Sequence, residues 1–190
     1  MRIHLETERL VLRRFVADDA DALLALHSDP EVMRYLTGGI PDSRETIEEA
    51  TLPRILGYYE QYAEFGLWAA IEKASGAFLG WFHLRPKDGA NPDAVDLGYR
   101  LHRSAWGKGY ATEASRAIIR QGFANPAVRR ITASAIAGNT ASRRVMEKVG
   151  LTLVRTYRSS HPDRFGGVEQ EIAEYALDRT EWQRQNATTT

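Results

Sequence analysis

Residues 106–114, which read WGKGYATEA, form the most informative turn of this chain. The turn stands between a predicted strand at residues 94–101 and a predicted helix at residues 111–123. The N–H groups of such a turn have no partner inside the helix, and the helix dipole adds partial positive charge. Since its two glycines let a ligand approach the backbone, the turn predicts a phosphate or pyrophosphate site; a turn that only joins strand to helix is the alternative.

The spacing within the turn narrows the choice of ligand. A Walker A pattern is absent, which excludes a P-loop. A dinucleotide turn would have Gly or Ala where Thr112 stands and an acid about 20 residues later, but no Asp or Glu occurs between Glu113 and Glu147. The same interval carries six arginines, which suit a ligand with an additional phosphate such as coenzyme A. The charge pattern alone does not exclude NADP as the ligand.

The rest of the chain predicts one α/β domain with a mixed sheet. The predicted order is strand, two helices, three strands, helix, strand, helix and two strands, without a repeat or linker. Residues 1–185 are expected to form this domain, and residues 186–190 a disordered tail. The other strands are expected at about 10–15, 67–71, 78–84, 130–136, 152–159 and 168–177, with Gly98 at a bulge or a close approach. The other helices are expected from Ala17 to Pro30, from Ser43 onward with a break at Pro53, and at 140–149, capped by Asn139 and Gly150, with a short turn at 180–182.

The composition is that of a globular protein, with 43% hydrophobic and 26% charged residues among 190. No apolar run approaches a membrane span, and the start MRIHLETERL lacks a secretory signal, so a cytoplasmic protein without membrane contact is expected. The absence of cysteine excludes disulfides, thiolate-bound zinc and a cysteine nucleophile.

The formal net charge is zero, but the charges are unevenly spread. Residues 15–65 hold eleven acids and three arginines, whereas residues 103–148 hold nine basic residues and two acids. Solvated helix faces would explain both blocks. The sharper interpretation places a polyanionic ligand on the basic segment and a cationic group on the acidic one. Zero net charge without a basic tail argues against a nucleic-acid partner.

Several motifs together resemble the Gcn5-related N-acetyltransferase (GNAT) superfamily, and more narrowly the RimJ/RimL-type branch that acetylates ribosomal-protein N-termini, with its small-molecule relatives. Their order and spacing cover nearly the whole chain. The resemblance implies a central mixed, mostly antiparallel sheet flanked by helices, acetyl-CoA as acyl donor, an amine acceptor and a possible homodimer. The motifs are TERLVLR (7–13), HSDPEVM (27–33), LGYRL (97–101), WGKGYATEA (106–114), NTASRRVMEKVGL (139–151), YAL (175–177) and TEW (180–182).

The resemblance also implies roles for particular residues. Backbone amides of residues 107–112 would hold the pyrophosphate, and the strand at residues 99–101 would pair with the pantetheine amides. Asn139 and Ser142 would flank the thioester. The superfamily has Gln or Arg where Trp106 stands, a departure common in the narrower branch. The full set of expected cofactor-binding residues is Tyr99, Arg100, Leu101, Trp106, Gly107, Lys108, Gly109, Tyr110, Ala111, Thr112, Asn139, Ser142 and Arg143.

Acyl transfer to an amine needs a base, an oxyanion donor and a proton for the leaving thiolate. Many relatives protonate the thiolate with a tyrosine, at the position where this chain has Met146. The narrower branch is thought to use a serine, and Ser142 is expected to take this role here. The alternative is that Ser142 only forms hydrogen bonds within its own helix. Asp96 is expected to be the base or to bind the amine; a solvent-facing strand carboxylate is the alternative. A backbone N–H near Leu101 would bind the oxyanion.

Two histidines, His83 and His161, are alternative bases, although each also suits a structural or surface role. No histidine stands in a metal-ligand pair, so no metal is expected. The expected enzyme transfers directly in a ternary complex. A non-catalytic acyl-CoA-binding or regulatory module, favoured by Met146, is the main alternative, and an NADP enzyme is a distant third. The acidic segment at residues 15–65 makes a cationic molecule or a peptide N-terminus a plausible acceptor.

Overall fold

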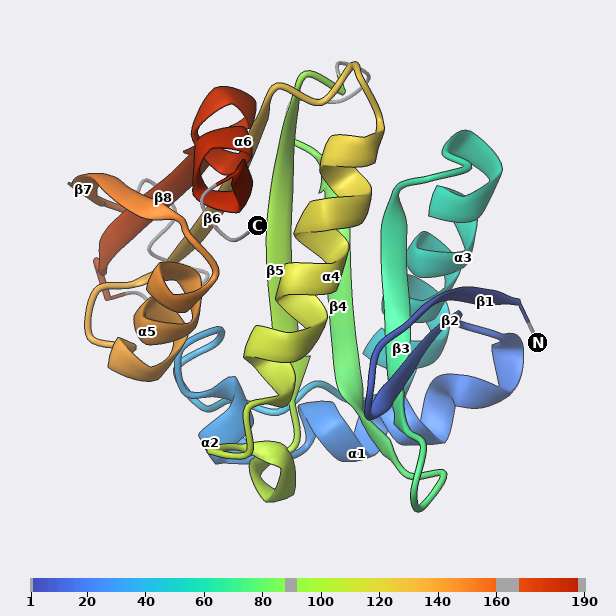
Figure 1. The fold of residues 1–190 in the computed structure, drawn as a ribbon. Coiled ribbons are helices and arrows are strands. Elements are labelled where there is room, and N and C mark those ends of the chain that lie inside the picture. Colours follow the sequence, from blue (N-terminus) through green and yellow to red (C-terminus); the bar gives the residue numbers. More distant parts are fainter. Residues whose placement is uncertain (1, 88–91, 160–167, 188–190) are drawn as a thin grey trace.

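The strands form one eight-stranded sheet in the order β1-β2-β3-β4-β5-β6-β8-β7 (Figure 1). The computed structural model describes residues 2–87, 92–159 and 168–187. Neighbouring strands are antiparallel except β5 and β6, so the expected mixed, mostly antiparallel sheet is confirmed. The strands are β1 (Ile3–Glu6), β2 (Leu10–Arg14), β3 (Gly66–Glu72), β4 (Phe78–Pro86), β5 (Ala94–Leu101), β6 (Arg130–Ile136), β7 (Thr152–Arg158) and β8 (Glu171–Asp178).

The helices follow the expected order with local differences. Pro30 was expected to end or redirect the first helix, and it redirects the chain: α1 ends at His27 and a new short helix begins at Pro30. Asp29 caps this helix, and the missing N–H of proline does no harm at a first position. Pro53 divides the second helical region into a π-helical turn and α3. The helices are η1 (Ala17–Asp19), α1 (Ala20–His27), α2 (Pro30–Met33), η2 (Thr46–Thr51), α3 (Leu52–Gln61), η3 (Arg103–Ala105), α4 (Tyr110–Ala124), α5 (Thr140–Lys148) and α6 (Arg179–Ala187).

Two sequence expectations differ from the structure at the chain ends. Strand β1 was not expected, and α6 replaces a short turn at residues 180–182. Helix α6 includes Asn186 and Ala187 of the expected tail, while residues 188–190 lie outside the described ranges. The aromatic side chain of Trp182 holds α6 against α4, with its ring centre 5.2 Å from that of Phe123.

The two faces of the sheet carry separate apolar layers. Alternate residues of β5, including Leu97 and Leu101, pack with Ile118 and other residues of α4, which crosses in front of β4 and β5 in Figure 1. On the opposite face, Leu23 of α1 and Ile55 of α3 pack with Phe15 and Ala69. Burying each large apolar side chain contributes about 1.5–3 kcal/mol. This packing fixes the start of α4 beside the end of β5.

Among the described strands, β5 and β6 are the only parallel neighbours, and the sheet is interrupted between them. These strands pair from Ala94/Arg130 to Asp96/Thr132 and then separate, although β5 continues to Leu101. On its far side β6 stays paired with β8 along its whole length. A wedge-shaped gap therefore opens between the second halves of β5 and β6, where one edge of β5 has no strand partner.

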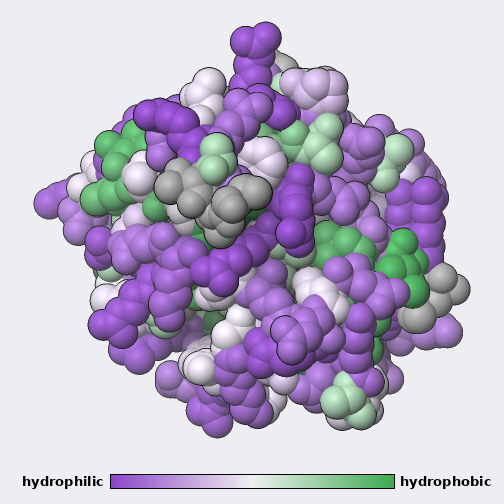
Figure 2. Space-filling view, viewed as in Figure 1, coloured by the Kyte–Doolittle hydropathy of each residue, from purple (hydrophilic) through white to green (hydrophobic). Residues whose placement is uncertain are grey.

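The surface is mainly hydrophilic on the face seen in Figure 2, with small hydrophobic patches. Strand β7 at the sheet edge exposes about half of Leu153 and Val154, at 49% each. Among the described helices, none combines the length and apolar character needed to cross a lipid bilayer.

Candidate active site

A cleft of about 920 Å³ occupies the gap between β5 and β6. Residues of β4, β5 and β6, of α1 to α3, of the glycine turn and of α5 line it. The structure thus brings together all the expected site residues except Lys108 and Arg143. These residues come from distant parts of the chain, so the gap in the sheet, not their sequence spacing, makes them neighbours.

The glycine turn presents its backbone to this cleft. Gly109 adopts φ +84, a left-handed conformation that favours glycine, and no side chain caps α4 at this position. The N–H of Glu113 is the first to bond within the helix, at 3.0 Å from the carbonyl of Gly109. The N–H groups of residues 110–112 therefore have no intrahelical partner, which is the geometry of an anion site.

Trp106 ties the glycine turn to the end of β5. Its indole Nε1 donates to the carbonyl of Leu101 at 2.8 Å, while 48% of the residue stays exposed. The N–H of His102 donates to Leu79 of β4 at 2.9 Å. Because backbone groups alternate in direction along a strand, the N–H of Leu101 points toward the gap, beside its own carbonyl. A backbone donor thus lies at the end of the cleft next to the glycine turn.

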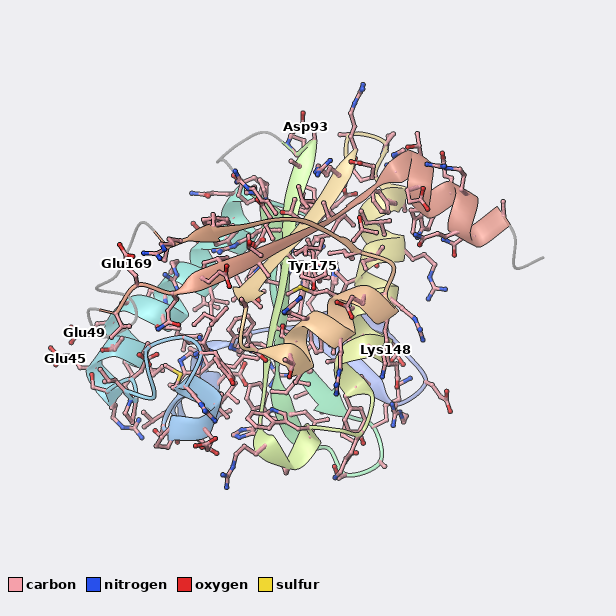
Figure 3. All side chains as sticks on the ribbon, turned by 90° about the vertical axis from the view of Figure 1, so that its left-hand side faces the viewer. Glu45, Glu49, Asp93, Lys148, Glu169 and Tyr175 are labelled. Carbon is pink, nitrogen blue, oxygen red and sulfur yellow. The ribbon has the colours of Figure 1, made fainter. Side chains whose placement is uncertain are left out.

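Helix α5 lines the cleft with Ser142, Arg144 and Lys148, whereas Arg143 turns away. Arg143 donates to the hydroxyl of Tyr175 at 2.9 Å and to the carbonyl of Ala137 at 3.1 Å. Figure 3 shows Tyr175 on β8 beside α5 and Lys148 at the end of that helix. Residues four apart share a helix face, so Arg144 and Lys148 both supply basic groups to the cleft. Arg144 is one of the six arginines expected to suit coenzyme A, but neither residue was assigned to the site.

The start of α5 is fixed by the cap expected from the sequence. Asn139 accepts a hydrogen bond from the N–H of Ser142 at 3.1 Å. At the other end, the N–H groups of Gly150 and Leu151 bond the last carbonyls, with Gly150 at φ +92. Both caps are confirmed, and together they hold Ser142 at the edge of the cleft. Met146, one turn later, is buried in the cleft wall.

Ser142 contacts a tyrosine from the facing strand. The hydroxyl of Tyr99 lies 3.1 Å from Oγ and 3.1 Å from the carbonyl oxygen of Ser142. Burial raises the pKa of Tyr99 to about 12, against a lowering effect of the hydrogen bond from Ser142. Tyr99 is therefore a neutral phenol at ordinary pH and keeps its proton available to Ser142.

On the opposite face of the sheet, Asp96 forms a pair with His83. The Nε2 atom of His83 lies 3.0 Å from Oδ2 of Asp96, and Arg85 lies 3.9 Å from the same oxygen. The His83 ring lies over Gly98, where a Cβ atom would come within 2.5 Å of it. The register of β4 and β5 is continuous, so Gly98 marks this close approach and not a bulge.

His27 is a wall residue that the sequence analysis did not assign to the site. Its Nδ1 lies 2.7 Å from Asp42, and its Nε2 accepts from the indole of Trp81 at 3.3 Å. Burial, and secondarily the positive charge of Arg100, lower the pKa of His27 to about 4. Both ring nitrogens are engaged in a neutral ring, so His27 positions its neighbours and does not accept protons.

Arg100 lies on this same face, although it was expected to bind the cofactor. Its guanidinium lies 5.1 Å from the Trp81 ring centre and donates to the sulfur of Met33 at 3.4 Å. Of the eleven acids of residues 15–65, only Glu31 and Asp42 line the cleft. Four of the other nine form ion pairs with arginines: Asp19, Asp21, Asp29 and Glu48. The acceptor side therefore has mixed charge.

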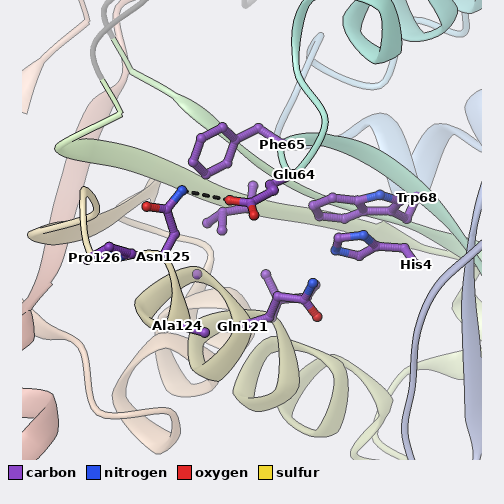
Figure 4. Close-up of a pocket in the computed structure, with 11 residues that line it drawn as sticks. His4, Glu64, Phe65, Trp68, Gln121, Ala124, Asn125 and Pro126 are labelled. Atoms are coloured by element: carbon purple, nitrogen blue, oxygen red, sulfur yellow. Dashed lines mark hydrogen bonds between the residues drawn. The ribbon is translucent and has the colours of Figure 1, made fainter.

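A second cavity of about 370 Å³ lies near the carboxyl end of α4 (Figure 4). His4 stacks on Trp68 with ring centres 3.8 Å apart, and burial lowers the pKa of His4 to about 4. Glu64 accepts a hydrogen bond from Asn125 at 2.7 Å. No cluster of three potential metal ligands occurs among residues 2–87, 92–159 and 168–187, and His161 lies outside these ranges.

The chain is similar to known acetyltransferases along most of its length. The model of the acetyltransferase (GNAT) domain matches residues 9–152. FsC-acetyl coenzyme A-N(2)-transacetylase of Aspergillus fumigatus is 31% identical over 187 residues, 95% of this chain and 78% of the relative. A GNAT-family acetyltransferase structure from Bacillus anthracis superposes with a TM-score of 0.76 and 25% identity, covering 95% of this chain and 99% of that chain. The structure of RimL, a ribosomal alpha-N-protein acetyltransferase in complex with coenzyme A, shares the fold with a TM-score of 0.78 and 19% identity, covering 93% and 98%.

Proposed function

The chain belongs to the GNAT acetyltransferase family and is an N-acetyltransferase, and we propose that it transfers acetyl from acetyl-CoA directly to a primary amine in a ternary complex. One observation carries the proposal: the gap between β5 and β6 opens to both faces of the sheet. Ser142 and Tyr99 stand on one face, and Asp96 and His83 on the other. A thioester in this gap can meet an amine without a covalent enzyme intermediate.

Coenzyme A would bind along the first face. The N–H groups at the start of α4 suit the pyrophosphate, and Arg144 and Lys148 suit the remaining phosphate charge. The unpaired edge of β5, from Leu97 to Leu101, would pair with the pantetheine amides as an added strand does. Because the pyrophosphate site lies beyond Leu101, the thioester would lie toward the Leu97 end of this edge, on the face that carries Tyr99 and Ser142.

The amine would approach from the face covered by α1 and α2. Asp96, His83 or a water held by this pair accepts the proton that the amine loses, and the nitrogen attacks the carbonyl carbon. A backbone N–H on this edge of β5 would stabilise the oxyanion while the new C–N bond forms. When the C–S bond breaks, Ser142 donates its hydroxyl proton to the sulfur and takes a proton back from water, with Tyr99 as its hydrogen-bond partner.

Two acceptor classes fit this proposal. The A. fumigatus relative is named for acetylation at an N(2) position, and RimL for acetylation of a protein α-amino group. Since Glu31 and Asp42 line the acceptor side together with Arg54 and Arg85, charge there selects neither class. A small-molecule amine and a peptide N-terminus therefore both belong in the first substrate screen, with cationic and neutral members of each.

The first test is calorimetric titration with acetyl-CoA, with NADPH as the comparison ligand. Saturable binding of acetyl-CoA alone is the expected result, and binding of NADPH alone would overturn the cofactor assignment. The second test follows release of the CoA thiol when amines and peptides are added. Amine-dependent release is expected; tight acetyl-CoA binding without release for any amine would favour the non-catalytic binding module.

A further inference from the structure

Glu113, in the first turn of α4, binds the turn between β1 and β2. Its Oε1 accepts from the hydroxyl of Thr7 at 2.6 Å and from the N–H of Arg9 at 2.9 Å. Its Oε2 accepts from Nε of Arg9 at 2.7 Å and lies 2.6 Å from Nη2. One carboxylate thus holds both residues of a segment more than 100 positions away in the sequence. We call Thr7, Arg9 and Glu113 the clasp.

The clasp also reaches the glycine turn itself. Nη1 of Arg9 donates to the carbonyl of Lys108 at 3.0 Å, and its guanidinium lies 4.4 Å from the ring centre of Tyr110. The hydroxyl of Tyr110 in turn bonds Glu72 on β3. Arg9 therefore spans the turn on both sides of Gly109. Every contact goes to the carbonyl or side-chain side of the turn, and none uses the N–H groups of residues 110–112.

The charge of Glu113 needs this arrangement. A carboxylate near the start of α4 repels an anion that approaches the same helix end, since both carry negative charge. Burial would raise the pKa of Glu113, but hydrogen bonds from Thr7 and Arg9 outweigh burial and hold the pKa below its usual value. The carboxylate stays ionised, and the forked guanidinium of Arg9 neutralises it where phosphate would bind.

We propose that the clasp is a positioning device for coenzyme A, in which Thr7 and Arg9 hold the glycine turn in its phosphate-binding shape through Glu113 and Lys108. The proposal rests on the proposed function, because it assumes that the turn binds a pyrophosphate. It assigns a role to the N-terminal TERL segment, which contributes nothing to the cleft lining. The α4 amides need a fixed geometry to act together, and the clasp supplies it from outside the ligand site.

The chain offers a matched control for this idea. Arg13, four residues after Arg9 on β2, makes an equally short two-pronged ion pair with Asp19, at 2.6 and 2.7 Å. Both carboxylates are well covered, with 18% of the Glu113 side chain and 8% of the Asp19 side chain exposed. Glu113→Gln and Asp19→Asn thus remove one charge each from comparable pairs, and only Glu113 adjoins the glycine turn.

The experiment compares acetyl-CoA affinity and thermal midpoint in the full-length wild type, Glu113→Gln, Asp19→Asn and Arg9→Lys. Glu113→Gln and Arg9→Lys are each expected to weaken acetyl-CoA binding by about tenfold. Glutamine removes the charge of the carboxylate, and lysine keeps the positive charge but cannot form the two-pronged hydrogen bond. Asp19→Asn is expected to lower the thermal midpoint with affinity within about twofold of wild type.

The outcomes separate the two proposals. Acetyl-CoA affinity in Glu113→Gln within twofold of wild type would overturn the clasp while leaving acetyl-CoA binding intact. Equal weakening of acetyl-CoA binding in Glu113→Gln and Asp19→Asn would mean that the clasp only stabilises the fold, and would overturn the proposal as well. Absence of acetyl-CoA binding in the wild type would refute the proposed function first. If Glu113→Gln does not fold, the acetyl-CoA affinity of Arg9→Lys decides in the same way. The wild-type Arg9 side chain is partly exposed, so its replacement by lysine should be tolerated.

Discussion

The hydroxyl of Tyr99 lies 3.1 Å from Oγ of Ser142, and this contact joins β5 to α5 across the mouth of the gap. Burial keeps Tyr99 protonated, with a pKa of about 12. Ser142 is thereby oriented by a partner that does not titrate in the working range of most enzymes. The helix tyrosine expected in many relatives is absent at Met146, and here a phenol from the opposite element reaches the serine instead.

Ser142→Ala is expected to lower turnover by at least about tenfold, because the leaving thiolate loses its proton donor. Acetyl-CoA affinity should change little, because the proposed phosphate contacts, at the start of α4 and on Arg144 and Lys148, do not involve Ser142. Tyr99→Phe should lower turnover less, since it removes only the partner of Ser142. Steady-state rates and calorimetry measure the two quantities. Unchanged turnover in Ser142→Ala would remove this residue from the mechanism.

Asp96→Asn is expected to lower turnover by about 100-fold or more if the carboxylate takes or relays the amine proton. His83→Gln separates the two groups: a similar loss indicates that the imidazole carries the proton, and a small loss indicates Asp96 or water. Asp178→Asn is the control, because this strand carboxylate also pairs with an arginine, Arg130 at 2.9 Å, outside the cleft. Rates of Asp96→Asn and His83→Gln equal to the control's would place the base elsewhere.

Gly109→Glu is expected to abolish acetyl-CoA binding, because it puts a side chain and a negative charge at the start of α4. Gly76→Glu is the control for backbone strain, since Gly76 also has a left-handed φ, +72, with open space around it. A left-handed non-glycine residue costs about 1–2 kcal/mol at either position. Folded Gly109→Glu that binds acetyl-CoA normally would contradict the assignment of the phosphate site.

The stability of the protein is expected to fall as pH decreases from about 6.5 to 4, in part through His27. Its folded pKa is about 4 and its unfolded value about 6.5, so acid protonates the unfolded chain first and favours unfolding. Between pH 7 and pH 5 this group should cost on the order of 2 kcal/mol.

His27→Asn keeps an N–H donor for Asp42 but does not titrate. Denaturant unfolding across this pH range should therefore show a flatter slope in the variant. His4, whose pKa burial also lowers to about 4, keeps part of the slope in both proteins. Identical pH slopes for wild type and variant would show that His27 is not held neutral.

Much of the fold could be predicted from local sequence because its elements are punctuated by strong signals. Asn139 and Gly150 mark the two ends of α5, and both caps form as expected. Strand β1 was missed because four residues with polar neighbours give little periodicity, and it is fixed by pairing with β2. The mostly polar sequence of α6 predicts only a turn, and the helix is held in place because Trp182 packs against α4.

The sequence predicts which segments of the chain form the candidate site better than it predicts where their side chains point. The glycine turn could be predicted from its residue composition, but the pairing of Asp96 with His83 depends on the register of β4 and β5. The sequence predicts Arg143 at the site, but Arg144 lines the cleft, because one residue along a helix turns the side chain by about 100°. The clasp joins residues 7–9 to Glu113, a contact that only tertiary folding produces.

Three residue pairs are all that join β5 to β6 in the described sheet. Under the proposed function, coenzyme A would fill the rest of that seam, with contacts to β5 on one side and to α5 on the other. The bound cofactor would then stabilise the packing of the two parts of the sheet against each other, in addition to carrying the acetyl group. A concentration 100 times the dissociation constant adds about 2.7 kcal/mol of stability. The heat resistance of this protein inside a cell would therefore follow the supply of acyl-CoA, and a shortage would loosen the protein before any acceptor was involved.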